Sequence, residues 1–287
     1  MREIKDGIYV ENKYGQRSET YLIKTKIEEN DRTLARMTKT EHLLLPWNYD
    51  LSVTIHSANL LGNDEKKFPA VLNKQTELYY LTIPSHLAKL INSVSFTHEL
   101  RGLSILNGGN LKLEKSLIMK KLLYLHTGSG EVYFTKENLP NLRTLSCKYR
   151  KELLPELYKY ELFDKLTLYS VHNNIFNEIS PIKDLYGLQI LRGKLENVQG
   201  ISTIKSLQWV ALSDLPKLTD LSGLSELPAL EYLEISYCKH IENWDFLLHL
   251  KRLKKLNVTA SSYKDYPPQK ILDMLREKGL KVPIKGS

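Results

Sequence analysis

Aliphatic residues in the second half of the chain follow a rhythm that neither a lone helix nor a lone strand uses. In LTDLSGLSELPALEYLEISYC (residues 218–238), leucine falls at every third position as far as Leu233, and Ile235 then follows after only two. Spacing of two is typical of a strand with one buried face. Spacing of three suits a 3-10 or helical segment, in which residues i and i+3 share a face. The pattern therefore predicts a short strand joined to a short helical return.

This unit repeats along the chain. The octets LENVQGIS (195–202) and LTDLSGLS (218–225) match in residue type, IENWDFLL (241–248) and FNEISPIK (176–183) are weaker copies, and a segment of the form LxxLxL follows each of them. Successive segments begin 19 to 27 residues apart. A single coil of this size cannot bury so many leucines unless it stacks on its neighbours. The expected segment starts are Leu51, Leu78, Leu100, Leu122, Leu142, Phe163, Leu188, Leu207, Leu230 and Leu253.

The segment LEYLEISYC (230–238) meets the leucine-rich repeat consensus LxxLxLxxN/C in full, with Cys238 at the Asn/Cys position. The chain thus resembles the leucine-rich repeat family, and its late repeats resemble the bacterial, internalin-type branch. The resemblance implies an α/β fold: a curved, horseshoe-shaped leucine-rich repeat solenoid. Its parallel β-sheet would line the concave face, with short helical, 3-10 or irregular segments on the convex side. Because most units lack the consensus Asn, we expect about ten irregular repeats with uneven curvature.

The chain is expected to divide into three parts: an N-terminal cap at 1–45, the leucine-rich repeats at 46–262, and a C-terminal cap helix and tail at 263–287. A solenoid needs such caps because its end coils have no neighbour to cover them. Within the first cap, the loose alternation of residues 7–27 predicts a hairpin that turns near Gly15.

The C-terminal cap carries clear helix signals. Pro267-Pro268 precedes the expected helix, Gly279 ends it, and residues 280–283 are expected to add a final edge strand. The apolar side of this helix comprises Ile271, Leu272 and Leu275.

Composition narrows the setting without identifying a partner. The 287 residues are 42% hydrophobic, which is enough for a sizeable core, and the formal net charge of +8 mildly favours acidic partners or nucleic acid. The start of the chain lacks the apolar segment of a secretory signal, and no apolar run is long enough to span a membrane. Two lone cysteines fit a reducing compartment. We therefore expect a cytoplasmic monomer without a membrane partner.

Motifs that carry chemistry are missing from the sequence. It contains no GxGxxG, GxxxxGK[ST], HExxH or GxSxG, and its histidines show no metal-ligand spacing. Cys147 occupies the last apolar slot of LRTLSC and Cys238 a turn slot, so both are interpreted as structural thiols. The expectation is a protein that is not an enzyme and that uses no cofactor and no metal.

The variable positions of each strand point to a binding face. If positions four and six of LxxLxL face the core, positions three, five and seven face the concave surface. Trp209, Tyr232 and Arg192 are expected to adjoin there as a binding hot spot, although aromatic residues on a sheet can also simply pair across strands. Tyr80 and Lys255 take equivalent positions. The candidate partner-binding residues are Tyr124, His126, Lys148, Lys165, Tyr169, Arg192, Lys194, Trp209, Tyr232 and Glu234.

These features favour a non-catalytic protein-binding module that grips an acidic or mixed-charge protein partner with a basic, aromatic concave face. By family analogy, one concrete form is an inhibitor such as a bacterial toxin-immunity protein, and a scaffold or regulatory subunit is another. A nucleic-acid-binding protein is the alternative from a different class, because interleaved Tyr, Trp, Lys and Arg also suit that role.

Overall fold

The computed structural model describes four strands before residue 55 and, from residue 80 onward, residues 80–95 and 100–280. The chain forms two compact units, Met1–Asn141 and Leu142–Ser287. Each unit is described by itself.

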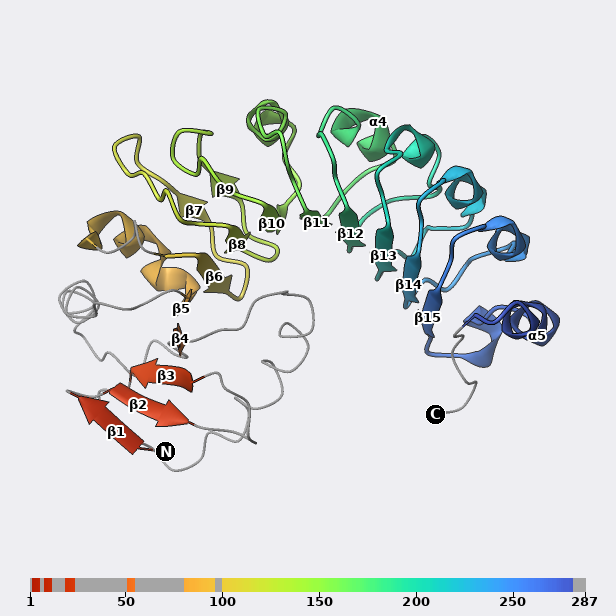
Figure 1. Cartoon of the computed structure of the whole chain (residues 1–287), viewed down its shortest axis with the longest axis horizontal. Helices are drawn as coiled ribbons and strands as arrows, with labels where there is room; N and C mark the ends of the chain where they lie inside the picture. Colours follow the sequence, from red (N-terminus) through yellow and green to blue (C-terminus); the bar gives the residue numbers. More distant parts are fainter. Residues whose placement is uncertain are drawn as a thin grey trace. The chain divides into compact units, whose positions relative to one another are not determined.

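The second unit is a stack of parallel strands. Successive strands begin 21 to 23 residues apart and pair without a register shift, so that Lys165, Gly187, Trp209, Tyr232 and Lys255 stand side by side. Within this unit the strands lie on the inner side of an arc and the helical segments on its outer side (Figure 1). The fold is a leucine-rich repeat solenoid, as the sequence predicts. Its strands are β10 (Thr144–Lys148), β11 (Lys165–Tyr169), β12 (Gly187–Leu191), β13 (Trp209–Ser213), β14 (Tyr232–Ser236) and β15 (Lys255–Thr259).

The returns between these strands are short and mostly 3-10, as the three-residue spacing predicts. In the 218–238 stretch, η8 covers Ser222–Glu226 and buries Leu224 before the chain enters β14. The other returns are η6 (Lys151–Leu153), α3 (Leu154–Leu157), α4 (Ile175–Ile179), η7 (Ile201–Thr203), η9 (Asp245–His249) and η10 (Tyr263–Asp265).

The core of the second unit consists of two apolar columns that run across the strands. Every member is at most 6% exposed, because the coils on either side cover it. Burying each leucine contributes about 1.5–3 kcal/mol against the entropy of ordering the chain. The first column is Leu145, Leu166, Leu188, Val210, Leu233 and Leu256, and the second is Cys147, Leu168, Ile190, Leu212, Ile235 and Val258.

The predicted segment start at Leu188 is wrong by three residues. Strand β12 is Gly187–Leu191, so the segment is LYGLQI and begins at Leu185. Leucines fill the first two apolar slots in either frame, which is why the sequence pattern alone was ambiguous. The turn decides: Arg192 directly after β12 is left-handed with φ 54°, as Asp214 is after β13. The Leu185 frame also gives even steps of 22 residues on both sides.

Helix α5 (Gln269–Glu277) covers the last coil and packs against η9. Its buried residues are the three predicted ones, Ile271, Leu272 and Leu275, and Gly279 follows with φ 80°. The left-handed conformation at Gly279 is the usual end of a helix, so the helix prediction is confirmed. The predicted edge strand at 280–283 lies beyond the described residues except for Leu280.

The first unit combines antiparallel and parallel strands. β1 (Arg2–Lys5), β2 (Ile8–Glu11) and β3 (Glu19–Ile23) pair antiparallel, which confirms the predicted hairpin between the last two. Parallel pairing then continues from β3. The further strands of this sheet are β4 (Leu51–Thr54), β5 (Tyr80–Pro84), β6 (Gly102–Leu106) and β8 (Tyr124–His126). The returns include η4 (Ser85–Ser93) and a small sheet of β7 (Leu111–Lys112) and β9 (Val132–Tyr133).

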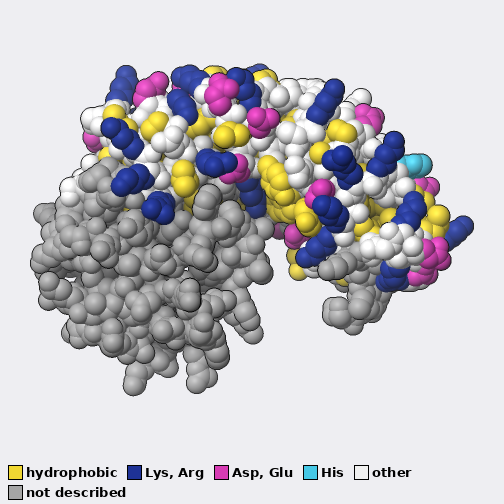
Figure 2. Space-filling model, viewed as in Figure 1, with side chains coloured by type: hydrophobic (Ala, Val, Ile, Leu, Met, Phe, Trp, Pro, Cys, Tyr) yellow, Lys and Arg dark blue, Asp and Glu magenta, His cyan; other side chains and the backbone are white. Residues whose placement is uncertain are grey.

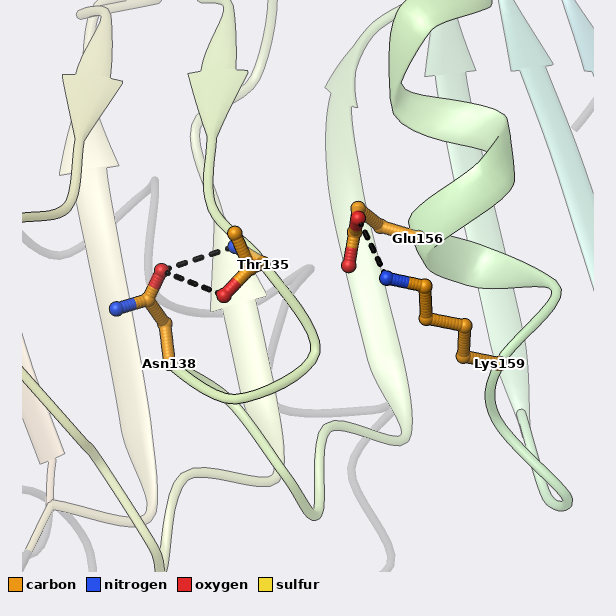
Figure 3. A network of polar contacts seen from close by, with 4 residues as sticks. All are labelled: Thr135, Asn138, Glu156 and Lys159. Atoms are coloured by element: carbon orange, nitrogen blue, oxygen red, sulfur yellow. Dashed lines mark hydrogen bonds and ion pairs between the residues drawn. The ribbon is translucent and has the colours of Figure 1, made fainter. Parts of the chain in front are cut away.

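Asn138 ties two coils of the first unit together. Its side chain is 1% exposed; its Oδ1 accepts from the Thr135 backbone N–H at 2.9 Å and from the Thr135 hydroxyl at 3.3 Å (Figure 3). Its Nδ2 donates to the carbonyl oxygens of Glu114 and Leu117 in the preceding coil at 2.8 and 2.7 Å. A buried amide with all these partners is stabilising because none of its polar atoms is left unpaired.

Candidate protein-binding surface

The strand face of the second unit gathers a compact group of large side chains. Trp209 and Tyr232 are opposite each other on β13 and β14, as predicted, and Lys165 takes the same position on β11. Glu234 lies two residues beyond Tyr232 on the same strand face. We call Lys165, Gly187, Trp209, Tyr232 and Glu234 the concave cluster.

Gly187 makes the central contact of this cluster possible. It stands between Lys165 and Trp209 in the register, and the Lys165 Nζ lies 4.0 Å from the Trp209 ring centroid. A Cβ atom at position 187 would lie 3.1 Å from Trp209 Cε3 and 3.5 Å from Lys165 Cγ. The two side chains therefore meet across β12 because the strand between them carries no side chain there. Sequence reasoning missed Gly187; the Leu185 frame would have placed it at position three.

Lys165 is only half-buried, yet its surroundings disfavour its charge. Burial lowers the pKa of its ammonium from 10.5 to about 8, and the negative charge of Glu234 opposes this effect without cancelling it. No ion pair or hydrogen bond joins Lys165 to another described residue. Within the described part of the chain, the cation–π contact with Trp209 and the charge of Glu234 are what offset the desolvation of Lys165.

Tyr186 extends the aromatic surface past the start of β12. Its side chain is 43% exposed, and burial of its hydroxyl raises its pKa, with further increases from Tyr232 and Glu231. Glu231 itself pairs with Lys254 at 2.7 Å. These residues immediately precede or begin their strands, so the surface continues from the strand face onto the edge where the strands start. The sequence alone did not single out Tyr186, because the predicted segment start at Leu188 left both Tyr186 and Gly187 outside the strand segment.

Arg192 and Lys194 are not on the strand face, which corrects two of the predicted positions. Both follow the end of β12, and both are exposed. Arg192 is five residues past Gly187, roughly 16 Å along an extended strand. Toward the other described residues its side chain makes only a long ion pair, with 3.8 Å from its Nε to Asp214 Oδ2. The predicted group of Trp209, Tyr232 and Arg192 therefore forms without the arginine, and Lys165 is the cation beside Trp209 instead.

The remaining predicted residues lie on strands but outside the concave cluster. Lys148 and Tyr169 pair at the far ends of β10 and β11, and Lys255 is exposed on β15. Tyr124 and His126 belong to the first unit, where their rings stack on β8 with centroids 6.3 Å apart and an interplanar angle of 11°.

Both cysteines are buried, as predicted for Cys147, and the turn residue Cys238 is covered as well. Burial raises the pKa of Cys147 to about 12 and that of Cys238 to about 11. The Cys238 thiol contacts the carbonyl oxygens of Ser236 and Leu212 at 3.5 and 3.7 Å. A thiol that stays protonated and covered cannot serve as a nucleophile near neutral pH.

The described residues contain no cluster of three or more His, Cys, Asp or Glu side chains able to hold a metal ion. In the same residues, every helix is too short or too polar to cross a membrane.

Comparison with known proteins finds similarity among solved structures. No family model and no curated protein matches the chain. Among solved structures, the chain is similar to an internalin from Listeria monocytogenes, with 18% sequence identity, a TM-score of 0.48, and coverage of 81% of this chain and 71% of that one. The assignment of leucine-rich repeats rests on the strand register and the apolar columns described above.

Proposed function

We propose that the chain is a non-catalytic protein-binding module that grips a protein partner with the strand face of its second unit. The observation that supports this proposal is the concave cluster, in which Trp209, Tyr232 and Lys165 stand together on a face that the helical returns leave uncovered. Trp and Tyr beside a cation are the composition typical of binding hot spots.

The polar groups of this cluster favour binding over simple cross-strand packing. The Tyr232 hydroxyl and the Glu234 carboxylate form no hydrogen bond or ion pair with another described residue, and neither does the Lys165 ammonium. Side chains retained only for packing across a sheet have no need of such groups. A partner that hydrogen-bonds to them gains affinity and geometric specificity.

The charges on the face favour a mixed-charge or acidic protein over a long polyanion. With Arg192 and Lys194 placed elsewhere, the strand face of the second unit carries Lys148, Lys165 and Lys255 against Glu234. In the view of Figure 2, Lys and Arg side chains are scattered over the described surface with Asp and Glu among them. A nucleic-acid site would instead concentrate basic residues along one track.

Within this class, an inhibitor such as a bacterial toxin-immunity protein is our more specific proposal, with a scaffold or regulatory subunit as its counterpart. We further propose that the chain is a monomer and that it is cytoplasmic; the two free, buried cysteines support the second point, because they suit a reducing compartment.

The test begins with affinity purification of the tagged chain from its native cell and identification of the co-purifying protein. Its affinity is then measured against the chain with Trp209→Ala, which should lose about 2 kcal/mol or more, roughly 30-fold in Kd. Met274→Ala, on the exposed side of α5, is the matched control and should bind as the original does. Equal affinity for both variants would show that the strand face is not the site.

Measuring the binding of random-sequence RNA at increasing salt concentration tests the alternative, a nucleic-acid-binding protein. Binding that weakens steeply with salt would indicate phosphate contacts and support a nucleic-acid role. Negligible binding at every salt concentration removes that alternative.

A further inference from the structure

Among the described residues, the ammonium of Lys165 has no carboxylate partner, although acidic side chains lie nearby. Asp164, its neighbour in sequence, is already held by Arg143 at 2.8 Å. Glu234 is close enough to influence Lys165 electrostatically but does not form an ion pair with it. The positive charge therefore sits against the Trp209 ring, partly shielded from water.

Such a group recognises a specific chemistry. A half-desolvated ammonium gains more from a carboxylate than a fully hydrated one does, because less water has to be displaced and the local dielectric is lower. The flanking Trp209 and Tyr232 rings offer apolar surface to whatever side chain adjoins the carboxylate. The negative charge of Glu234 repels a second acid on the same ligand, which disfavours a continuous acidic run.

We propose that Lys165 is a carboxylate-recognition point, at which a single Asp or Glu side chain of the protein partner docks while an adjacent apolar side chain of the partner packs on Trp209 and Tyr232. This proposal rests on the proposed function and names the chemistry of the partner at that surface. Gly187 is the positioning residue, because it lets Lys165 and Trp209 meet.

The experiment uses the full chain and a random 12-residue peptide library displayed on phage. Peptides recovered on the full chain should be enriched in an acidic residue next to an apolar one. For one recovered peptide, affinities are measured for the chain and its Lys165→Met variant, each with the acidic peptide and with its Asp→Asn or Glu→Gln form. Lys165→Met should lower the affinity for the acidic peptide at least tenfold and the affinity for the amide form less than twofold.

Two further variants sharpen the result. Lys165→Arg keeps the positive charge and should retain more affinity for the acidic peptide than Lys165→Met does. Lys217→Met, which removes an exposed lysine from the return between β13 and β14, should change affinity less than twofold. Unfolding curves of each variant separate a binding effect from a loss of fold.

The outcomes distinguish this inference from the proposed function. Two results would overturn carboxylate recognition by Lys165 and leave the protein-binding face in place. Either the recovered peptides need Trp209 but contain no acidic residue, or Lys165→Met weakens binding of the acidic and amide peptides equally. Peptides that bind equally well to the Trp209→Ala variant, or a library that yields no enrichment, overturn both.

Discussion

The second unit and the described coils of the first unit stack parallel strands in the same way but connect neighbouring coils differently. In the second unit every strand has five residues, and two unbroken apolar columns run through all six. In the second unit one asparagine, Asn173, accepts from the Glu196 N–H of the next coil, whereas in the first unit β8 has only three residues and the side chains of four described asparagines bridge successive coils. These bridges are made by Asn92 to Lys112 and Glu114, Asn110 to Glu131, Asn138 to Glu114 and Leu117, and Asn141 to Lys120.

The difference teaches how irregular repeats can still stack. Apolar burial has no direction and rewards any coil that covers its neighbour, so regular coils need little else. Where the returns change form, as at β7 and β9, the ladder is only two residues long, and the backbone N–H groups of Glu114 and Glu131 just outside it donate to asparagine side chains. A side-chain amide can supply a donor and an acceptor at the places that the backbone leaves open.

The largest effect should come from breaking an apolar column in the second unit. Leu233→Ala removes a side chain that is 2% exposed and leaves a cavity between two coils, so it should lower the free energy of unfolding by about 2–5 kcal/mol. Urea unfolding followed by circular dichroism measures this. Leu162→Ala, at a site 54% exposed, is the control and should cost about 1 kcal/mol or less. Similar costs for the two would mean that the column does not hold the coils.

In the first unit, the substitution that corresponds to Leu233→Ala is Asn138→Ala, which removes a side chain that bridges two coils. It removes the side-chain partner of the Glu114 and Leu117 carbonyl oxygens and of the Thr135 N–H and hydroxyl, so the free energy of unfolding should fall by about 2–4 kcal/mol. Asn141→Ala removes one exposed hydrogen bond to Lys120 and should cost about 1 kcal/mol or less. If the two substitutions cost the same, burial of the amide is not what stabilises these coils, and the contrast between the units loses its basis.

Sequence periodicity predicted the fold of the second unit because each residue of its two apolar columns occupies a fixed position in the repeated LxxLxL spacing. It predicted the α5 helix for a similar reason: Pro, apolar periodicity and Gly occur in the order that a helix requires. The bridges of the first unit were not predictable, because an asparagine in a return looks the same in sequence whether it is buried between coils or exposed to water. The proposed division at residues 45 and 262 stays a prediction.

The candidate site was predicted in part for a physical reason. Trp209 and Tyr232 follow from repeats with an unambiguous frame, and their pairing is confirmed. Arg192 and Lys194 were placed on the face because the repeat before them offers leucines in two frames. Lys165 was predicted to face the concave surface, but its contact with Trp209 depends on the missing side chain at Gly187, which spacing rules for apolar residues do not register.

The faces of the two units share one arrangement and should differ in their response to pH. Gly102 separates Tyr80 from Tyr124 in the register of the first unit, as Gly187 separates Lys165 from Trp209 in the second. Of these two arrangements, only the one in the second unit places a cation, Lys165, against an aromatic ring, and the pKa of that lysine is lowered. The charged or titratable groups around it are Glu234 and Tyr232 on β14 and the Asp164–Arg143 pair just before β11.

The sign of the pH effect follows from the lowered pKa of Lys165. Between about pH 8 and 10.5 the folded chain binds fewer protons at this site than the unfolded chain, so the stability of the original chain should rise with pH across that window. Lys165→Met lacks this term. The stability difference between the original and Lys165→Met should shift by about 1 kcal/mol in favour of the original between pH 7.5 and 10, after allowance for partial solvation. Parallel unfolding curves at the two pH values measure the shift, and a constant difference would contradict it.

The smallest predicted effect concerns the turn that ends each strand. Asn107 takes the left-handed conformation after β6 in the first unit, and Arg192 takes it after β12 in the second, with φ values of 58° and 54°. Asparagine and glycine adopt this conformation at lower cost than a long side chain does. Arg192→Asn should therefore raise the free energy of unfolding by about 0.5–1 kcal/mol, measured by urea unfolding.

The same variant separates the turn from the binding face. Since Arg192 lies past the end of β12, Arg192→Asn should leave partner affinity within twofold while Trp209→Ala weakens it. The corresponding change at Asp214, which has the same backbone conformation but a residue type that tolerates it, should alter stability less. A loss of affinity with Arg192→Asn would extend the binding surface to the edge where the strands end. A loss of stability would mean that the long ion pair to Asp214 outweighs the backbone cost, and that the second unit, too, depends on polar bridges between its coils.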